Sequence, residues 1–350
     1  MSKILMKGNE ALAEGAIRAG CMAYFGYPIT PSSEIAEYMA RTYPKIGGTF
    51  LQAESELAAI NMVYGAAATG KRVMTASSGP GISLKQEGIS FLGEAELPCL
   101  IVNISRGGPG LGGIQPAQSD YFQATRGGGH GDYHILVLAP ASVQEMMDFA
   151  MLSFELADQY RIPAMIMAEG TLGQMMEPIF PREKITEFVD KPWATTGCKG
   201  RKPNIVNTLH LSPDFLEYRN RHLQAKYEQI KANEPRSETF MLDDAELVIV
   251  AFGLMSRIVK RSVMEARRKG IKVGMIRPVT LWPFPDEIFK QAAETAKLFL
   301  SVEISMGQMV EDIRLAVNGK VPVDFYGRIG FIPNPQEITR QIVSIAGSVK

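Results

Sequence analysis

The feature of this sequence that most constrains its fold is the alternation of short apolar runs with amphipathic segments. The run PCLIVNIS at residues 98–105 is almost continuously apolar, as expected of a parallel strand covered on both faces. Residues 54–69 have instead the 3.6-residue apolar spacing of a helix. Such segments alternate through the first half of the chain, which predicts a three-layer α/β fold with a parallel sheet between helices.

The same alternation divides the chain into three parts. It breaks between Met176 and about Asp243, where prolines, mixed charges and the polar run LEYRNRHLQAKYEQIKAN predict a linker containing one long exposed helix. A second α/β unit begins at the strand-like AELVIVAFG and closes with a helix over 334–346. We therefore expect a first domain, a linker with a helical excursion and a compact second domain, at 1–178, 179–243 and 244–350.

Charge and hydropathy exclude several classes of protein. The 37 basic and 37 acidic side chains balance, so nucleic acid is not an expected partner. No apolar run reaches the roughly 18 residues of a membrane span. The N-terminus lacks the continuous apolar region of a signal peptide, so we expect a cytoplasmic location without membrane contact.

Cysteine and histidine spacing also limits the chemistry of the chain. Cys21, Cys99 and Cys198 are far apart and form no CxxC pair, so they do not provide the four thiolates of an iron–sulfur cluster. We expect them to be buried in a reducing cytoplasm. The four histidines lack the spacing of a zinc site.

The segment YPITPSSE at 27–34 joins an apolar run to an amphipathic one. In its simplest interpretation it is a strand-to-helix turn, in which Ser32 or Ser33 accepts a hydrogen bond from the first free amides of the helix. The two prolines also restrict the local backbone. We therefore expect Thr30 to be held in a fixed direction at the carboxyl end of the strand, where open α/β sheets bind ligands.

Other segments place polar groups at the ends of predicted elements. Glu54 and Glu56 begin an almost wholly apolar helix; the helix dipole favours acids there, and a half-buried one could share a proton with a ligand nitrogen. Arg106 follows the strand PCLIVNIS, where its guanidinium could bind a carboxylate or be paired structurally. The glycines of SSGPGIS, at 77–83, allow a ligand to approach the backbone closely.

The loop RGGPGLGG at 106–113 contains a formal match to G-x-G-x-x-G. A dinucleotide site needs this loop to open a helix that faces the pyrophosphate. Here Pro116 delays any helix until near Ser119, and no acid ends a following strand at the proper distance. The sequence therefore does not favour a nicotinamide-dependent dehydrogenase.

Together these segments resemble the alpha subunits of the 2-oxoacid:ferredoxin oxidoreductases. The resemblance covers nearly the whole chain apart from residues 180–240, and the joint occurrence of the matching segments in this order is highly specific. The matching segments are GYPITPSSE at 26–34, QAESELAAINMVYGAAATG at 52–70, TASSGPGISLKQEGISFLGEAELP at 75–98, RGGPGLGG at 106–113, QSDYFQATRGGGHGD at 118–132, EISMGQM at 303–309 and YGRIGFIP at 326–333.

The resemblance implies a thiamine-diphosphate-binding domain of the pyrimidine type, followed by a transketolase C-terminal-like α/β domain that packs and assembles rather than catalyses. The family binds the cofactor between two chains, and a glutamate protonates or hydrogen-bonds N1′ of its aminopyrimidine ring. Glu56 aligns with that glutamate, and Glu54 remains the alternative. The cofactor-binding residues implied for this chain are Glu56, Tyr27, Pro28, Ile29, Ser78 and Gly79.

The resemblance also implies that several groups belong to partner subunits. The diphosphate and Mg²⁺ are normally bound by GDG with a downstream asparagine, whereas this chain has GDY at 131–133. Magnesium is thus expected on a beta subunit, and the iron–sulfur clusters on partner chains. Gamma- and delta-type subunits, ferredoxin and CoA complete the implied set of partners.

For the reaction, the resemblance implies oxidative decarboxylation of a 2-oxoacid to acyl-CoA and CO₂ with reduction of ferredoxin. Thr30 would lie beside the carbonyl or carboxylate, and Arg106 would bind the carboxylate. The 3-methyl-2-oxobutanoate (2-oxoisovalerate) branch fits best. A 2-oxoglutarate enzyme is the alternative; its second carboxylate would need another cation, for which Arg126 and His130 are candidates. The alternative of a different class is a non-catalytic assembly subunit.

Overall fold

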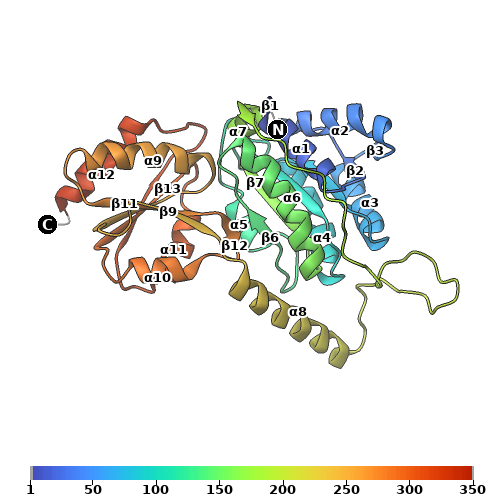
Figure 1. Cartoon of the computed structure of the whole chain (residues 1–350). Helices are drawn as coiled ribbons and strands as arrows, with labels where there is room; N and C mark the ends of the chain where they lie inside the picture. Colours follow the sequence, from blue (N-terminus) through green and yellow to red (C-terminus); the bar gives the residue numbers. More distant parts are fainter. Residues whose placement is uncertain (1–2, 349–350) are drawn as a thin grey trace.

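The computed structural model describes residues 3–348, which form two α/β units side by side (Figure 1). In the described part of the chain the larger sheet has seven strands in the order β12-β6-β7-β5-β4-β2-β3. Strands β2 to β7 pair in parallel, and β12 closes one edge in the antiparallel direction. The strands are β2 (Ala23–Gly26), β3 (Thr49–Gln52), β4 (Val73–Ser77), β5 (Leu100–Ser105), β6 (Leu136–Leu138), β7 (Ala164–Glu169) and β12 (Thr280–Trp282).

Helices cover both faces of the larger sheet, as the continuous apolar runs predicted. In β5, Leu100 and Val102 pack into the cluster that contains α1, α2 and α6, whereas Ile101 packs into the cluster that contains α3 and α4. This division follows from the twofold side-chain period of a strand. The helices are α1 (Gly8–Arg18), α2 (Ser33–Ile46), α3 (Glu56–Ala68), α4 (Gly79–Glu94) and α6 (Val143–Tyr160). Two short helices, α5 (Tyr121–Thr125) and α7 (Gly170–Gln174), follow β5 and β7.

The smaller sheet has the order β14-β13-β10-β11-β9 among the described residues, with β9 antiparallel to its neighbour. Helices α9 and α12 lie on one side of it, and α10 and α11 lie on the other (Figure 1). Its elements are β9 (Ser237–Phe240), β10 (Leu247–Val250), α9 (Gly253–Arg267), β11 (Val273–Pro278), α10 (Asp286–Ala292), β13 (Leu298–Glu303), α11 (Met309–Val317), β14 (Val323–Gly327) and α12 (Pro335–Ser348).

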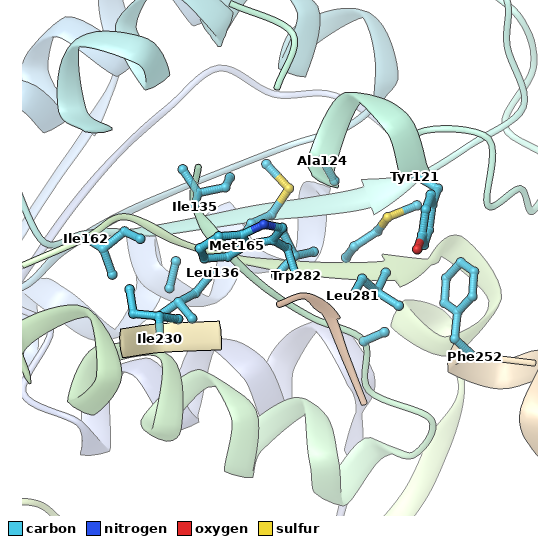
Figure 2. Packing of buried hydrophobic residues seen from close by; sticks show 14 of the residues in the cluster. Tyr121, Ala124, Ile135, Leu136, Ile162, Met165, Ile230, Phe252, Leu281 and Trp282 are labelled. Atoms are coloured by element: carbon cyan, nitrogen blue, oxygen red, sulfur yellow. The ribbon is translucent and has the colours of Figure 1, made fainter. Parts of the chain in front are cut away.

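The two units share one continuous core. Figure 2 shows Trp282 of β12 among Leu136, Met165 and Ile230, all of which are buried. Trp282 also stacks on His134, with ring centroids 4.6 Å apart. The second unit therefore contributes a strand to the sheet of the first, an arrangement that the local pattern around Trp282 did not predict.

The segment between the units begins with β8 (Met176–Ile179), which pairs with β1 (Ile4–Lys7). An extended stretch then leads to α8 (Pro213–Asn233), the long helix that the sequence predicted. The expectation that this helix is simply exposed was incomplete, because Leu223, Tyr227 and Ile230 form a buried stripe along it.

Ion pairs fasten α8 to the first unit. Arg219 and Lys226 pair with Glu96 at 3.1 and 2.9 Å, and His222 lies 3.0 Å from the same carboxylate. Burial by itself raises the pKa of Glu96, but Lys226, followed by His222, outweighs it and lowers the pKa to about 2. Such contacts between residues far apart in sequence explain why hydropathy alone underestimated the burial of the helix.

The burial of the cysteines and the hydropathy of the helices were two further expectations from the sequence. Cys21 and Cys99 are buried as expected, but Cys198 is exposed in the extended stretch before α8, so the expectation of burial was wrong there. None of the helices in residues 3–348 combines the length and hydropathy that a membrane span requires.

A buried polar cluster joins the carboxyl ends of the two sheets. Gln118 donates to the carboxylate of Glu169 and, at 3.0 Å, to the carbonyl of Phe252. Its own side-chain oxygen accepts from the amide of Ile304 at 3.0 Å, and the amide of Leu254 donates to Glu169 at 3.3 Å. The cluster therefore fixes the second unit against the end of β7, close to the loops described below.

We expect this cluster to make stability depend on pH. Burial raises the pKa of Glu169 from its ordinary value of 4.5 to about 7, so the folded chain keeps a proton that the unfolded chain releases between these values. The free energy of unfolding therefore falls as the pH rises through this window, by about 3 kcal/mol at roughly 1.4 kcal/mol per pH unit, and levels off above it. Urea unfolding between about pH 5 and pH 8 measures this slope.

Glu169→Gln should remove that slope, because glutamine does not titrate. Glu155→Gln, on the exposed face of α6, is the matched control and should leave the slope unchanged. An equal pH dependence in the wild type and in Glu169→Gln would show that another group is responsible.

Candidate active site

The turn between β4 and α4 is the centre of the candidate site. The helix begins at Gly79, so the predicted residues Ser78 and Gly79 form the start of the helix itself. Ser77 and Ser78 are fully buried, and their hydroxyls have no hydrogen-bond partner among the described residues. Buried hydroxyls normally have partners, so this turn has free hydrogen-bonding capacity for a ligand.

Glu56 lies directly against this turn. A Cβ built at Gly81 would lie 2.6 Å from Oε1 of Glu56 and 2.1 Å from Oγ of Ser77, so only glycine leaves room for the carboxyl group. Glu56 is buried at the first position of α3, where Ser55 caps the helix by accepting from the amide of Ala58 at 3.1 Å. This first helical position lies at the positive end of the helix dipole, which favours a carboxylate.

Glu54, the alternative acid, lies outside this arrangement. Its side chain is exposed and precedes the helix, whereas Glu56 is buried beside the turn. Burial and the contact at Gly81 therefore both favour Glu56 as the acid that faces a ligand in the turn.

Arg106 reaches the other side of the same turn from the end of β5. Its side chain is buried, and its Cγ would lie 3.7 Å from a Cβ built at Gly79. Nη1 donates to the carbonyl of Thr30 at 2.9 Å and Nη2 to the carbonyl of Leu111 at 3.1 Å. The structure thus brings together Thr30, Gly79 and Arg106, three of the predicted site residues. Nε of Arg106 is buried and has no hydrogen-bond partner in the described chain.

The segment that contains Thr30 is open to solvent along most of its length. Tyr27, Pro28 and Thr30 are exposed, and Ile29 is half-buried. The predicted serine cap of α2 was wrong: the hydroxyl of Ser32 donates to the carbonyl of Ile29 at 2.8 Å and makes no capping bond. The backbone at Ser32 is not extended, which directs the hydroxyl back into the turn.

A cavity of about 910 Å³ adjoins Arg106 and lies between the two units. Its first wall comes from the start of α4 and the loop after β5, and its second from residues 306–308 and Ile329 of the second unit. The expectation that the second unit only packs and assembles is therefore too narrow, because it closes one side of this cavity. The apolar and charged side chains that line it are Pro80, Leu84, Arg106, Pro109, Asp120, Phe122, Met306 and Ile329.

Asp120 is a cavity residue that the sequence analysis missed. Its Oδ2 accepts from Asn103 at 3.0 Å and from Ser105 at 3.3 Å. Burial raises the pKa of this carboxyl, although these hydrogen bonds and Arg106 oppose the shift. The sequence signal that could have indicated this site is the pair of polar side chains, Asn103 and Ser105, inside an otherwise apolar strand.

Arg126 and His130, the candidates for binding a second carboxylate, do not line this cavity. Arg126 pairs with Asp312 at 2.8 Å, and His130 lies 3.5 Å from Ser90 with its ring edge-on to Phe91.

The glycine-rich loop that starts at Arg106 closes on itself through a bridge between Arg106 and Pro116. It does not open a helix, as a dinucleotide-binding loop would have to. Within residues 3–348 no group of three or more His, Cys, Asp or Glu side chains is arranged to hold a metal ion.

This architecture is a transketolase-like α/β fold. A solved split-gene transketolase, described as an inactive beta4 tetramer, has the same fold over 99% of both chains, with a TM-score of 0.62 and 12% sequence identity. The family model for the thiamine diphosphate-binding region of pyruvate flavodoxin/ferredoxin oxidoreductases matches residues 14–239, and that for core domain II of pyruvate:ferredoxin oxidoreductase matches residues 245–338. The chain therefore belongs to the 2-oxoacid:ferredoxin oxidoreductase family.

Individual relatives support the same assignment. The ketoisovalerate oxidoreductase subunit VorB of Methanothermobacter marburgensis is 53% identical over 99% of both chains. The 2-oxoglutarate synthase subunit KorA of Methanocaldococcus jannaschii is 38% identical, covering 97% of this chain and 98% of KorA. A solved 2-oxoglutarate:ferredoxin oxidoreductase from Magnetococcus marinus, with 2-oxoglutarate, coenzyme A and succinyl-CoA bound, matches 99% of this chain with a TM-score of 0.87 and 28% identity. This chain spans 65% of that one.

Proposed function

We propose that this chain is the alpha subunit of a thiamine-diphosphate-dependent enzyme that oxidatively decarboxylates 3-methyl-2-oxobutanoate to an acyl-CoA and CO₂, with reduction of ferredoxin. The observation that carries the proposal is the convergence of Glu56 and Arg106 on the turn between β4 and α4, with Arg106 also bonded to the carbonyl of Thr30. The 53% identity to a ketoisovalerate oxidoreductase subunit supports the choice of reaction.

The residues of the turn fit the aminopyrimidine half of the cofactor. Glu56 offers a buried carboxyl for N1′ of the ring, and the unpartnered hydroxyls of Ser77 and Ser78 offer further hydrogen bonds. Tyr27, Pro28 and Ile29 would complete the binding site from the neighbouring loop. When bound, thiamine diphosphate supplies a nucleophilic carbon and accepts the electron pair released with CO₂. Glu56 would hold or move a proton at N1′.

Thr30 and Arg106 would orient the substrate. The free Nε of Arg106, with the remaining N–H groups of its guanidinium, can donate to the substrate carboxylate while its bonds to Thr30 and Leu111 fix its position. The Thr30 hydroxyl would lie beside the carbonyl or carboxylate. Fixed donors of this kind bring the reacting groups together without further loss of conformational freedom.

The cavity supports a substrate with one carboxylate and a branched apolar tail. Among the described residues that line it, Arg106 is the cation, and about half of the other non-glycine side chains are apolar or aromatic. A dicarboxylate would need a second cation, and Arg126 is already paired with Asp312 outside the cavity. These features favour 3-methyl-2-oxobutanoate over 2-oxoglutarate, the acid after which the KorA relatives are named.

Partner subunits would complete the site. We infer that a beta subunit binds the diphosphate and Mg²⁺, and that partner chains carry the iron–sulfur clusters that pass electrons to ferredoxin. Tyr27, Leu51, Leu57 and Leu84 are exposed on segments that carry or flank the site residues, and exposed apolar groups near a site are consistent with a protein interface there.

The proposal predicts a substrate preference in the purified complex. Reduction of an electron-acceptor dye with CoA should show a kcat/KM for 3-methyl-2-oxobutanoate about 10-fold or more above that for 2-oxoglutarate, because the second carboxylate would be desolvated without a partner. A preference for 2-oxoglutarate would overturn the choice of substrate. An assembled complex without activity on either acid would support the non-catalytic assembly subunit instead.

A further inference from the structure

Lys85 is a buried charge for which the proposed function has no role. It lies on α4 in ISLKQEGI, a segment whose inward-facing residues are otherwise uncharged. Its side chain is fully buried, and Nζ has no hydrogen-bond partner among the described residues. An ammonium group taken from water without a partner is strongly unfavourable unless a nearby charge compensates for it.

The helix geometry directs Lys85 toward Glu56. Lys85 follows Gly81 by four residues on α4, so the two positions share one face of the helix. Side chains on a helix also point back toward its N-terminus, which carries Lys85 toward Gly81. The space in front of Gly81 holds Oε1 of Glu56, 2.6 Å from where a Cβ would lie. The helix geometry therefore directs the ammonium toward the carboxylate, although Nζ forms no hydrogen bond with it in the described chain.

The electrostatics agree with this geometry. Burial lowers the pKa of Lys85 to about 8, and the opposing influence is the charge of Glu56 on the facing helix α3. The inward-facing polar side chains next to Lys85 on its own helix, such as Gln86, are neutral, as are Thr75 and Ser77 of β4. Lys85 therefore still carries most of its charge at neutral pH, and Glu56 is the charged group that it faces.

We propose that Lys85 is a positioning residue that holds Glu56 in its ionised form beside the aminopyrimidine site. The inference rests on the proposed function, in which Glu56 shares a proton with N1′. A nearby positive charge favours a carboxylate over a carboxylic acid, so replacing Lys85 by a neutral residue should make the carboxylate of Glu56 easier to protonate. In this role Lys85 acts through Glu56 rather than on the substrate or cofactor directly.

The first test compares the pH dependence of cofactor C2 proton exchange in complexes that carry wild-type Lys85, Lys85→Met or Lys85→Arg. Methionine keeps a similar length without charge, and arginine keeps the charge. We expect the acidic limb of the profile to move up by about one pH unit in Lys85→Met, a tenfold change in the proton equilibrium. In Lys85→Arg it should stay at the wild-type position. A uniform loss of rate at every pH, with the limb unmoved, would show that Lys85 is merely structural.

A second measurement needs no cofactor. A double-mutant cycle of Lys85→Met and Glu56→Gln, followed by urea unfolding of the cofactor-free complex, should give a coupling of about tenfold or more in the unfolding equilibrium constant. Additive effects would overturn the proposal. If Lys85→Met prevents assembly, Lys85→Gln replaces it in both measurements with the same expected outcomes. If the double-mutant cycle shows coupling but the wild-type complex shows no C2 exchange, the proposed function is contradicted. The pairing of Lys85 with Glu56 would still stand.

Discussion

Replacing Glu56 with glutamine should lower kcat for the 2-oxoacid by about 10²-fold or more, since positioned proton transfer typically contributes 10²–10⁴-fold. Glutamine keeps the shape of the side chain and its place against Gly81 but cannot exchange a proton with a ring nitrogen. The KM for the oxoacid should change little, because Glu56 lies on the cofactor side of the turn and Arg106 on the other. Steady-state assay of the purified complex with saturating thiamine diphosphate measures both constants.

The control for this variant is Glu54→Gln. Glu54 is two residues away, exposed and outside the contact at Gly81, so its replacement should leave kcat within about twofold of the wild type. Equal losses in the two variants would mean that the segment tolerates no change of charge. A loss confined to Glu54→Gln would transfer the catalytic role to Glu54.

Replacing Arg106 with alanine should raise the KM for the oxoacid about 30-fold or more, since loss of a buried charged contact costs roughly 2–5 kcal/mol in binding. Part of the effect will come from the protein itself, because Arg106 also holds the carbonyls of Thr30 and Leu111. Its loss leaves both carbonyls without that donor and loosens the loop that lines the cavity.

Arg106→Lys separates the two contributions. Lysine keeps the positive charge but not the planar fork that donates to two carbonyls and a ligand at once. We expect an intermediate rise in KM with a small change in kcat. If KM were unchanged in Arg106→Ala while kcat collapsed, Arg106 would organise the loop rather than bind the substrate carboxylate.

Local pattern predicted the framework of the molecule well. Apolar runs identified the parallel strands, and with them the edge of the sheet at which the turns that contain Thr30, Gly79 and Arg106 lie. This succeeded because the carboxyl ends of parallel strands share one edge of a sheet, so residues distant in sequence converge without any knowledge of their contacts.

The features that sequence did not predict depend on contacts between distant segments. Asp120 enters the cavity because Asn103 and Ser105 hold it, and the second unit reaches the same cavity through Met306. The missing cap at Ser32 has a similar cause, since its hydroxyl donates to the carbonyl of Ile29 instead. No periodic pattern records these choices, because each depends on which polar partner the folded chain brings within reach.

Lys85 shows the same limit in another form. A lysine in a helical segment is usually interpreted as part of a solvent-exposed face. Here only the facing helix, which places Glu56 against Gly81, reveals that Lys85 is buried. A charge in an apolar face beside a glycine four residues earlier is the signal that could have indicated it.

The central claim, that Glu56 of this chain serves the aminopyrimidine ring of thiamine diphosphate, is tested most directly by hydrogen–deuterium exchange at C2 of the bound cofactor. Rapid quench and NMR can measure this exchange without substrate, in complexes that carry wild-type chain, Glu56→Ala or Glu54→Ala. We expect fast exchange in the wild type and in Glu54→Ala, and exchange no faster than that of free cofactor in Glu56→Ala. Wild-type exchange in the Glu56→Ala complex would contradict the claim.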